Sequence, residues 1–335
     1  MSQGWNIAIL GATGAVGRAL IECLEQRQFA VGDVTLLASE EGAGESIRFA
    51  GKNYLVQDAR NHDWSDSQLA FFVAGQQASA DYADLAAEAG CIVIDSSGLF
   101  ALAHDVPLAV VGVNDSTLAD YRNRNIIAVA DSQVSQLMNA IAPLNEAASV
   151  QSIQLTELLS VSAQGKAAVD ALAGESARLL NGIPPESYHF GRQLAFNMMP
   201  LAIDDQGSVA AERRVVDQVR KILQDESFSL SVTSLQAPVF YGNAQSVRVI
   251  TARPLDVDEA QQVLTGQADL AVSEEHDFPT PVSEGTGQDQ LYIGAIRQDY
   301  GQPEGLQFWS VADNVRYGGA LMAVKTAERL IGDYL

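Results

Sequence analysis

The sequence is poor in basic residues and in cysteine. Lys and Arg together number 20 against 42 Asp and Glu, which gives a formal net charge of −22. A surface so acidic repels polyanions, so neither a nucleic acid nor an anionic membrane is expected as a partner. The two cysteines, Cys23 and Cys91, fall in a helix-like and a strand-like segment. Both are therefore expected as buried thiols rather than as a disulfide.

Long apolar runs are also missing. No run approaches the roughly 18 apolar residues of a membrane helix, and the first strand pattern starts at Trp5, so neither a membrane span nor a signal peptide is expected. The 335 residues are 47% hydrophobic, which suits two domains with buried cores. These features predict a soluble cytoplasmic protein.

Several catalytic signatures are absent. No tyrosine has a lysine four residues later, as short-chain dehydrogenases require, and no Gly-x-Ser-x-Gly elbow occurs. The histidines have no His or Cys partner at the spacing of metal ligands, so no metal site is predicted. They are expected to be structural or exposed, and stand at His62, His104, His189 and His276.

The strongest positive signal lies at the start of the chain. The apolar segment Trp5–Leu10 runs into Gly11-Ala12-Thr13-Gly14-Ala15-Val16-Gly17, and a helical pattern follows. Such a strand, loop and helix present free backbone N–H groups and a helix dipole to a diphosphate. The spacing is G-x-x-G-x-x-G, so a turn without a ligand is the alternative. The candidate nucleotide-binding residues are Gly11, Thr13, Gly14, Ala15, Val16 and Gly17.

The hydrophobic pattern changes character near residue 131. Before it, short strands alternate with helices, which predicts a parallel sheet. After it, longer strands and fewer helices predict a large mixed or antiparallel sheet. The expected strands are 34–38, 70–74, 91–95, 125–130, 150–161, 228–240, 245–251, 290–296 and 306–311. The expected helices are 79–89, 132–145, 165–180, 212–223 and 314–331, with loops at 182–185 and 279–287.

The end of the second expected strand bears on the cofactor. It reads Ser39-Glu40-Glu41, and an acidic side chain there accepts hydrogen bonds from ribose hydroxyls but repels a 2′-phosphate. Ser39 and Glu41 therefore join the candidate cofactor residues, and NAD is favoured over NADP. The alternative is that Glu41 is a solvated loop residue.

Many segments, in order, resemble the aspartate-semialdehyde dehydrogenase family over nearly the whole chain. They are the residues 11–17, 87–90, 93–97, 105–108, 126–128, 161–166, 195–200, 238–240, 278–281, 294–297 and 308–316. The resemblance implies an α/β fold in which a Rossmann-like dinucleotide-binding domain, 1–130, is joined to an α+β dimerisation domain with a large mixed sheet, 131–313. It implies a homodimer, a final helix 314–335 that returns to the first domain, and Gly165 and Asn314 as further cofactor-binding residues.

The same resemblance implies a reaction, and this chain departs from its residues. In the family a cysteine thiolate attacks the aldehyde, hydride passes to the nicotinamide and phosphate releases the product, while a histidine moves the proton and two arginines hold the anions. Here Ser132 stands at the cysteine and Asn243 at the histidine. Gln236 and Ala101 replace the two arginines, Leu159 the assisting glutamine, and Glu41 the arginine that grips the NADP phosphate. A glutamate and a lysine that border the substrate align with Ala211 and Arg214.

These replacements leave three hypotheses. Loss of a general base alone costs roughly 10²–10⁴-fold in rate, so the first is a non-catalytic member that keeps fold, dimer and nucleotide binding, and that could pair with an active relative. The second is an active NAD-dependent oxidoreductase with a different aldehyde or oxo substrate. The third is a structural subunit without a ligand.

Overall fold

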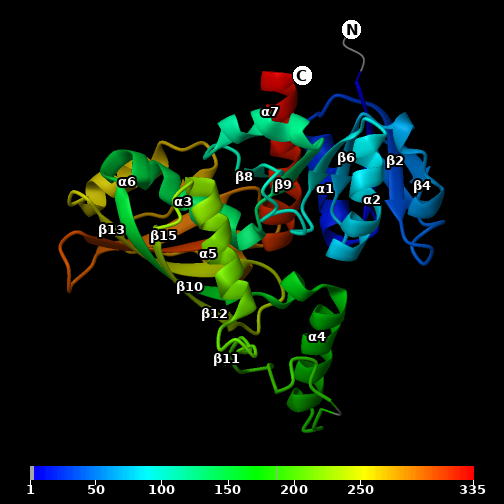
Figure 1. Cartoon of the computed structure of the whole chain (residues 1–335). Helices are drawn as coiled ribbons and strands as arrows, with labels where there is room; N and C mark the ends of the chain where they lie inside the picture. Colours follow the sequence, from blue (N-terminus) through cyan, green and yellow to red (C-terminus); the bar gives the residue numbers. More distant parts are fainter. Residues whose placement is uncertain (1–3, 186) are drawn as a thin grey trace. The chain divides into compact units, whose positions relative to one another are not determined.

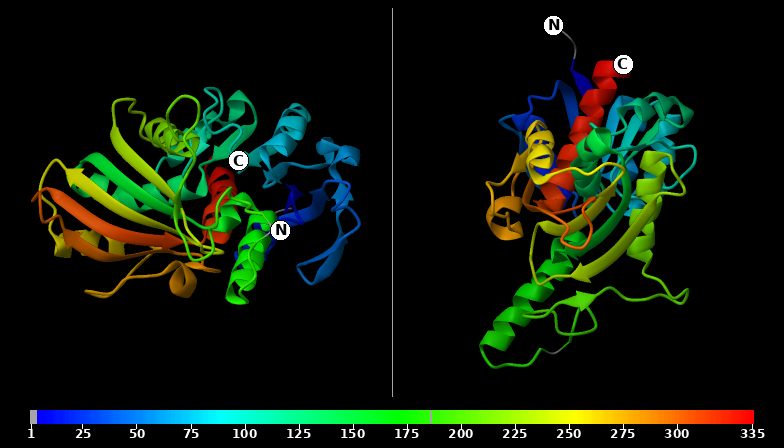
Figure 2. Two further views of the ribbon diagram at one scale, coloured as in Figure 1. Left: turned by 90° about the horizontal axis from the view of Figure 1, so that it is seen from below. Right: turned by 90° about the vertical axis from the view of Figure 1, so that its left-hand side faces the viewer.

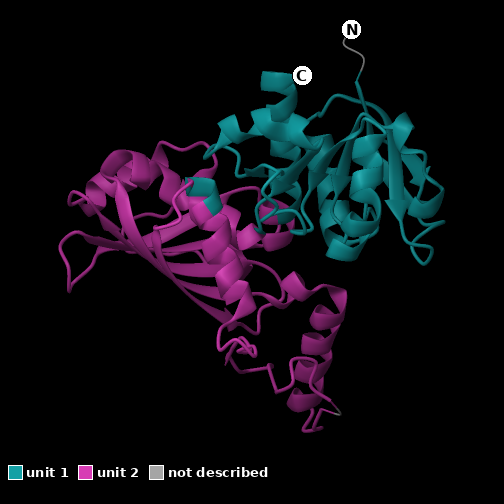
Figure 3. Ribbon diagram, in the orientation of Figure 1, with its two compact units in different colours: residues 1–131, 221–223, 319–335 teal, residues 132–220, 224–318 magenta. Residues whose placement is uncertain are grey.

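The computed structural model describes residues 4–185 and 187–335, which form two compact units (Figure 3). Unit 1 contains residues 1–131, 221–223 and 319–335, and unit 2 contains residues 132–220 and 224–318. Residues 314–318 thus belong to unit 2, and residues 319–335 belong to unit 1.

Unit 1 is built on a parallel sheet with the order β5-β2-β1-β6-β7-β9-β8. The strands are β1 (Trp5–Leu10), β2 (Val31–Ala38), β5 (Gln57–Asp58), β6 (Leu69–Phe72), β7 (Ile92–Asp95), β8 (Leu108–Ala109) and β9 (Ile126–Val129). Every residue of β6, β7 and β9 is buried, as expected of parallel strands covered on both faces. This confirms the Rossmann-like sheet.

The helices of unit 1 follow the strands as the alternating pattern predicts. They are α1 (Ala15–Gln26), α2 (Gln76–Glu88) and α7 (Met322–Tyr334), with 3₁₀ turns at Ala59–Asn61, Trp64–Asp66 and Asp115–Asn123. α1 contacts α7, and α2 packs on β6 and β7 (Figure 1). Cys23 and Cys91 are buried thiols that form no disulfide among the described residues, which confirms their expected state, and burial raises the pKa of Cys91 to about 12.

Unit 2 is built on a mixed sheet with the order β11-β12-β10-β13-β16-β15-β14. The strands are β10 (Val150–Leu159), β11 (Met199–Pro200), β12 (Ser229–Gln236), β13 (Asn243–Thr251), β14 (Leu270–Val272), β15 (Leu291–Gln298) and β16 (Gly305–Ala312). β10 runs parallel to β12 and antiparallel to β13, which confirms the predicted mixed sheet. Figure 2 shows the long central strands side by side.

Some helices of unit 2 pack on this sheet, whereas one helix projects away from it. α3 (Ser132–Ala148) packs against β10, β13, β15 and β16, and also against α6 (Val257–Thr265). α5 (Ala210–Leu223) places the Glu212 carboxylate on the Ser234 backbone N–H of β12, 2.7 Å away. α4 (Lys166–Leu180) follows a 3₁₀ turn at Val161–Gln164 and projects away from the sheet (Figures 1 and 2).

Two expected elements differ in the structure. The predicted helix 314–331 begins with π-helical turns, Asn314–Leu321, before α7. The Gly318 N–H donates to the Asp313 carbonyl at 3.0 Å, five residues earlier, and the glycine pair at 318–319 tolerates this wide turn. The predicted loop 279–287 contains a further π-turn, Pro281–Gly285.

Other elements were not predicted. They include α6 and the hairpin of β3 (Ser46–Phe49) and β4 (Lys52–Leu55). A signal for α6 was present, because the Asp256 side chain accepts from the Glu259 N–H at 2.8 Å in a Asp-x-x-Glu start. The hairpin has weaker signals, since its four-residue strands are mostly polar.

Candidate functional site

The predicted nucleotide loop of unit 1 has the shape that the glycines indicate. Gly11 has φ +97°, and its N–H donates to the Leu37 carbonyl at 2.9 Å, which fixes the loop to the end of β2. The Gly14 N–H donates to the Gly11 carbonyl at 3.0 Å and closes the turn before α1. Gly14 thereby ends the loop as the residue preceding the helix.

Close approach of helix and strand depends on Gly17. A Cβ at this position would lie 2.1 Å from the Gly11 carbonyl oxygen and 2.8 Å from the Ala12 Cα, both backbone atoms that cannot turn aside. Among the described residues, no side chain caps α1, so its first N–H groups are not taken by a capping side chain. This geometry fits the diphosphate of a dinucleotide, with Thr13, Ala15 and Val16 completing the turn.

Carboxylates surround the end of β2. Ala38 pairs with Asp58 of β5, and Asp58 and Glu40 both form ion pairs with Arg60. Hydrogen bonds from the Arg60 side chain and from its backbone N–H hold the pKa of Asp58 below its ordinary value. Ser39 accepts backbone hydrogen bonds from Gly42 and Ala43 through its carbonyl, which turns the chain, and Glu41 is exposed.

Arg18, the residue after Gly17, is also paired. Its guanidinium forms an ion pair with Glu45, while Nε donates to the Thr13 carbonyl at 3.2 Å. Arg18, after the glycine loop, and Arg60, beside the end of β2, therefore both have carboxylate partners.

Ser132 is the first residue of α3 and is packed closely by the backbone. Its Oγ lies 3.3 Å from Gln133 Oε1. A Cβ on Gly318 would lie 2.3 Å from the Ser132 Cβ and 2.8 Å from its Cα, so the glycine is needed for this approach. Among the described residues, no side chain that could act as a base is recorded in a hydrogen bond with Ser132 Oγ.

Asn243 begins β13 and is almost fully buried, with 1% of its surface exposed. Its Oδ1 accepts from the backbone N–H of Ser160 at 3.0 Å and from the Ser160 hydroxyl at 3.1 Å. The carboxamide therefore serves as an acceptor that fixes the end of β10, a role that a protonated imidazole cannot take.

Gln236 and Leu159 lie together at the ends of β12 and β10. Gln236 Nε2 donates to the Leu159 carbonyl at 2.8 Å, and its Oε1 accepts from Gln164 Nε2 at 2.9 Å. The amide of Gln236 is thus engaged at both ends. Ala211 and Arg214 both lie on α5.

Gly165 and Asn314 also belong to unit 2. Gly165 has φ +84° and precedes α4, and its N–H donates to the Ser162 carbonyl at 3.0 Å. Asn314 Oδ1 accepts from the Ser160 hydroxyl at 2.9 Å and from the Gly242 N–H at 3.1 Å. The Asn314 amide also exchanges hydrogen bonds with the Ser162 hydroxyl, so its neighbours hold it firmly.

Sequence reasoning missed part of this arrangement. Six carboxamides, which we name the amide cluster, occupy this part of unit 2: Gln133, Gln164, Gln236, Asn243, Gln245 and Asn314. Gln245 Nε2 donates to the Gln133 carbonyl at 2.8 Å. Gln245 follows Asn243 by two residues on an expected strand. The strand period of two therefore could have placed both side chains on the same face of the sheet.

Ala101 is buried in unit 1, and an ammonium group lies on its backbone. Lys221 Nζ donates to the carbonyls of Ala101, Ala103 and Val106 at 2.9, 2.6 and 2.8 Å. Burial lowers the pKa of Lys221. Sequence reasoning also missed this lysine, which holds the loop where the family resemblance places a phosphate-binding arginine.

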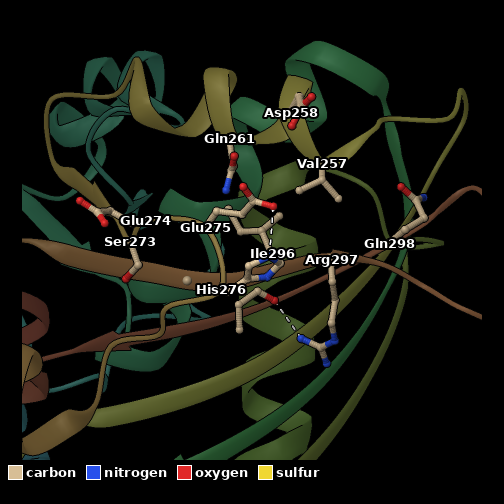
Figure 4. A pocket seen from close by; sticks show the side chains of 12 residues that line it. Val257, Asp258, Gln261, Ser273, Glu274, Glu275, His276, Ile296, Arg297 and Gln298 are labelled. Carbon is tan, nitrogen blue, oxygen red and sulfur yellow. Dashed lines mark hydrogen bonds and ion pairs between the residues drawn. The ribbon is translucent and has the colours of Figure 1, made fainter.

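A separate hollow of about 490 Å³ lies beside α6 and β15 (Figure 4). Its lining includes Asp258, Glu274 and Glu275, which are exposed, and His276, whose ring lies 3.2 Å from the Glu275 carboxylate. Arg297 donates to the Ala295 carbonyl at 2.9 Å at the other side. The hollow contains none of the predicted site residues.

Within residues 4–185 and 187–335, no three His, Cys, Asp or Glu side chains are grouped so that they could hold a metal ion. In the same described ranges, none of the helices has the length and apolar character needed to cross a bilayer.

Two family models match the chain. Residues 6–121 match the semialdehyde dehydrogenase NAD-binding domain, and residues 141–317 match the semialdehyde dehydrogenase dimerisation domain. Unit 1 thus carries the NAD(P)-binding domain of this family, and unit 2 carries its dimerisation domain.

Full-length relatives agree with these matches. The chain is 42% identical over 337 residues to aspartate-semialdehyde dehydrogenase 2 of Vibrio cholerae, with all of both chains covered. It is 39% identical over 338 residues to a protein named USG-1 protein homolog from Pseudomonas aeruginosa, again with full coverage of both. The solved structure of Vibrio cholerae aspartate semialdehyde dehydrogenase II, complexed with ASA, matches with a TM-score of 0.97 at 41% identity over all of both chains.

Proposed function

Because the chain belongs to the aspartate-semialdehyde dehydrogenase family, we propose that it keeps the family's nucleotide binding and homodimer but not phosphorylating aldehyde oxidation. A bound NAD would supply a hydride acceptor, and the loop Gly11–Gly17 would hold its diphosphate. The single observation that carries the loss of activity is Asn243, whose acceptor oxygen is used by Ser160 at the position of the family's proton carrier.

The remaining positions support the same proposal. A serine hydroxyl such as that of Ser132 is far less acidic than a thiol and needs an adjacent base before it can attack a carbonyl. Gln236 is bound at both ends of its amide, and Ala101 offers no cation to a phosphate. Loss of the base alone would lower the rate by about 10²–10⁴-fold, and these residues act as a unit, so their losses do not add.

The activity assay is direct. Purified protein is mixed with aspartate semialdehyde, phosphate and either NAD or NADP, beside the Vibrio cholerae aspartate-semialdehyde dehydrogenase 2 as the positive control. We expect reduced nucleotide to form only with the control. Turnover within about tenfold of the control would refute the proposal.

We further propose that NAD is bound in preference to NADP. Glu41, Glu40 and Asp58 place three carboxylates at or beside the end of β2, where the adenosine ribose of a dinucleotide lies in this fold. Arg60 forms ion pairs with two of them, Glu40 and Asp58. A 2′-phosphate would have to compete with these carboxylates.

The cofactor preference is tested by separate titrations of NADH and NADPH, in which nucleotide fluorescence reports binding. We expect NADH to bind more tightly than NADPH. We expect Glu41→Arg to change the ratio of the two dissociation constants by about tenfold in favour of NADPH. Glu88→Arg, a charge change on α2, serves as the matched control. Tighter NADPH binding by the unmodified protein would contradict the preference, and no binding of either nucleotide would favour the structural-subunit hypothesis.

The dimer is proposed to form through the face of the unit 2 sheet opposite α3. On β10 the buried Ile153 and Leu155 alternate with the more exposed Gln154 and Thr156. Across the sheet, the same face continues with Arg248, Ser246, Gln307 and Trp309. We expect a dimer by analytical ultracentrifugation and a monomer for Thr156→Arg.

An active oxidoreductase with another carbonyl substrate is the second candidate, favoured by the 42% full-length identity to a named dehydrogenase. It predicts NADH consumption with some member of an aldehyde and ketone panel. A panel without turnover, with NADH binding demonstrated, would remove it. Pairing with an active relative and a cytoplasmic location remain predictions.

A further inference from the structure

β12 lies next to the short strand β11 at the outer edge of the unit 2 sheet (Figure 1). In a strand, the N–H and C=O of one residue point to the same side, and successive residues alternate. The Ala237 N–H donates to the Leu159 carbonyl of β10 at 3.0 Å, so the odd-numbered residues of β12 face β10. The even-numbered residues therefore direct their backbone groups outward.

Other groups close this edge at both of its ends. On one side, the Ser234 carbonyl accepts from the Leu201 N–H at 3.3 Å, and the Ser234 N–H donates to the Glu212 carboxylate at 2.7 Å. On the other side, the Phe228 carbonyl accepts from the Arg220 guanidinium at 3.4 Å. α5 therefore supplies an acidic group at one end and a basic group at the other.

The two outward-facing residues between these ends are open. β11 pairs only with Leu235 and Gln236, and within residues 4–185 and 187–335 the outward N–H and C=O groups of Leu230 and Val232 have no hydrogen-bond partner. Natural edge strands are usually protected by charged residues, proline or bulges, and β12 contains none of these. The four open groups are therefore a template for another strand.

A hollow of about 590 Å³ lies between α5 and this open edge. Four aliphatic side chains line it, those of Ile203, Val209, Val216 and Val232, and Ile203 is 72% exposed. Its charged lining is balanced, with two acidic and two basic side chains, those of Glu212, Asp217, Arg213 and Arg220. A strand added at the edge can therefore place an uncharged aliphatic side chain in the hollow.

We propose that a second copy of this chain occupies the open edge, with its β12 antiparallel to the first about a two-fold axis beside Ser231. In this register, Leu230 of each copy lies opposite Val232 of the other, and the two residues exchange both N–H···O hydrogen bonds. All four open groups of each copy are then satisfied. The leucine of the second copy also lies beside Val232 and the hollow that it lines.

No neighbouring register satisfies every open group. An axis at Leu230 would set Val232 against Phe228, whose carbonyl already accepts from a guanidinium. An axis at Val232 would set Leu230 against Ser234, whose outward N–H and C=O are both in use. The groups that close the two ends therefore select the axis beside Ser231.

The selected register also aligns opposite charges. Ser234 of one copy lies opposite Phe228 of the other, which brings Glu212 toward Arg220 of the second copy. The two-fold axis repeats this pair on the other side. A second copy thus matches the edge in both hydrogen bonding and charge, although the chain as a whole has a net charge of −22.

The register is tested by disulfide trapping in the full chain. Directly opposite residues in a non-hydrogen-bonded antiparallel pair have Cα atoms about 4.5 Å apart, a distance that a disulfide spans. Ser231 is exposed, whereas the natural Cys23 and Cys91 are buried. With oxidised glutathione as the oxidant, we expect Ser231→Cys to form covalent dimers at least about tenfold faster than Gln262→Cys, an exposed change on α6. Electrophoresis without reductant measures both rates.

Sedimentation equilibrium measures the same contact without a covalent bond. A ladder this short makes a small interface, and small interfaces are weak, so we expect association near about 1 mM and little at about 10 µM. The average mass of the unmodified protein should rise about twofold over this range. Ser231→Lys, which sets two ammonium groups against each other at the axis, should abolish the rise, and Gln262→Lys should preserve it.

Three results would overturn the inference. They are cross-linking of Ser231→Cys no faster than that of Gln262→Cys, an average mass that stays constant up to about 1 mM, and a rise in mass that Ser231→Lys does not alter. If Ser231→Lys does not fold, the ratio of the two cross-linking rates still decides. Neither assay contains a nucleotide or an aldehyde, so a failure of the proposed function leaves both readouts unchanged.

Discussion

The glycine loop of unit 1 and the amide cluster of unit 2 are held in different ways. In the loop, Gly11, Gly14 and Gly17 make backbone contacts over a few residues. In the cluster, side chains such as Asn243 and Asn314 join residues that lie 83 and 154 positions apart along the chain. The comparison teaches that a site shaped by the main chain depends on a few neighbouring residues, whereas a site shaped by side chains depends on the assembled sheet.

The largest expected effect comes from Gly17→Ala. The new Cβ would collide with three backbone atoms, so we expect about 3 kcal/mol of lost stability and loss of NADH binding. Urea unfolding and NADH titration measure both. The matched control is Gly75→Ala, which precedes α2 with φ −77° and has no atom within 4 Å of the added Cβ. Equal stability of the two variants would break the comparison.

Gly318→Ala applies the same change to unit 2. Its Cβ would press on Ser132, and because this residue starts a helix and can shift, we expect a smaller loss of about 2 kcal/mol. Ser132→Gly in the same chain should recover part of that loss, since the clash is with Ser132 Cβ as well as its Cα. A strictly additive double variant in urea unfolding would contradict this account.

His62 provides a pH-dependent contrast within unit 1. Burial lowers its pKa from 6.5, so the folded state disfavours the charged ring. The contribution of the neutral His62 ring to folding stability is therefore fully present above pH 6.5, and it is lost as the pH falls through the lowered pKa of the folded state. Below pH 6.5, we expect the free energy of unfolding of His62→Gln to fall less steeply with pH than that of the unmodified protein, a difference of less than about 1 kcal/mol. The exposed His104→Gln is the control, and identical pH profiles for the two variants would exclude the effect.

The smallest expected effect is that of Ser132→Ala. Its hydroxyl makes one long contact, 3.3 Å, with Gln133, so removal should change stability by less than about 0.5 kcal/mol. Any background turnover of aldehydes should also stay unchanged. A drop of tenfold or more in such turnover would show that Ser132 is a nucleophile and would restore the active-enzyme hypothesis.

Local patterns account for what the sequence predicts well. The parallel sheet, the mixed sheet and the glycine turn each depend on residues close together, such as Trp5–Leu10 followed by Gly11. Helix geometry was harder, because the π-turns after Asp313 depend on a carbonyl that accepts from Gly318 five residues later. No periodicity of 3.6 residues reports such a turn.

The candidate site divides in the same way. Alignment by resemblance located Asn243 and Gln236, but it could not reveal that Ser160 and Gln164 hold their amides. Those pairings join separate strands and loops, and they exist only after the sheet has formed.

Lys221 has a consequence for how relatives of this chain can vary. Its ammonium group has three protons, and three carbonyls from Ala101 to Val106 receive them. These three hydrogen bonds form only if the loop from Ala101 to Val106 keeps its length. In relatives of this chain, we therefore expect insertions or deletions in this loop to occur together with replacement of the lysine.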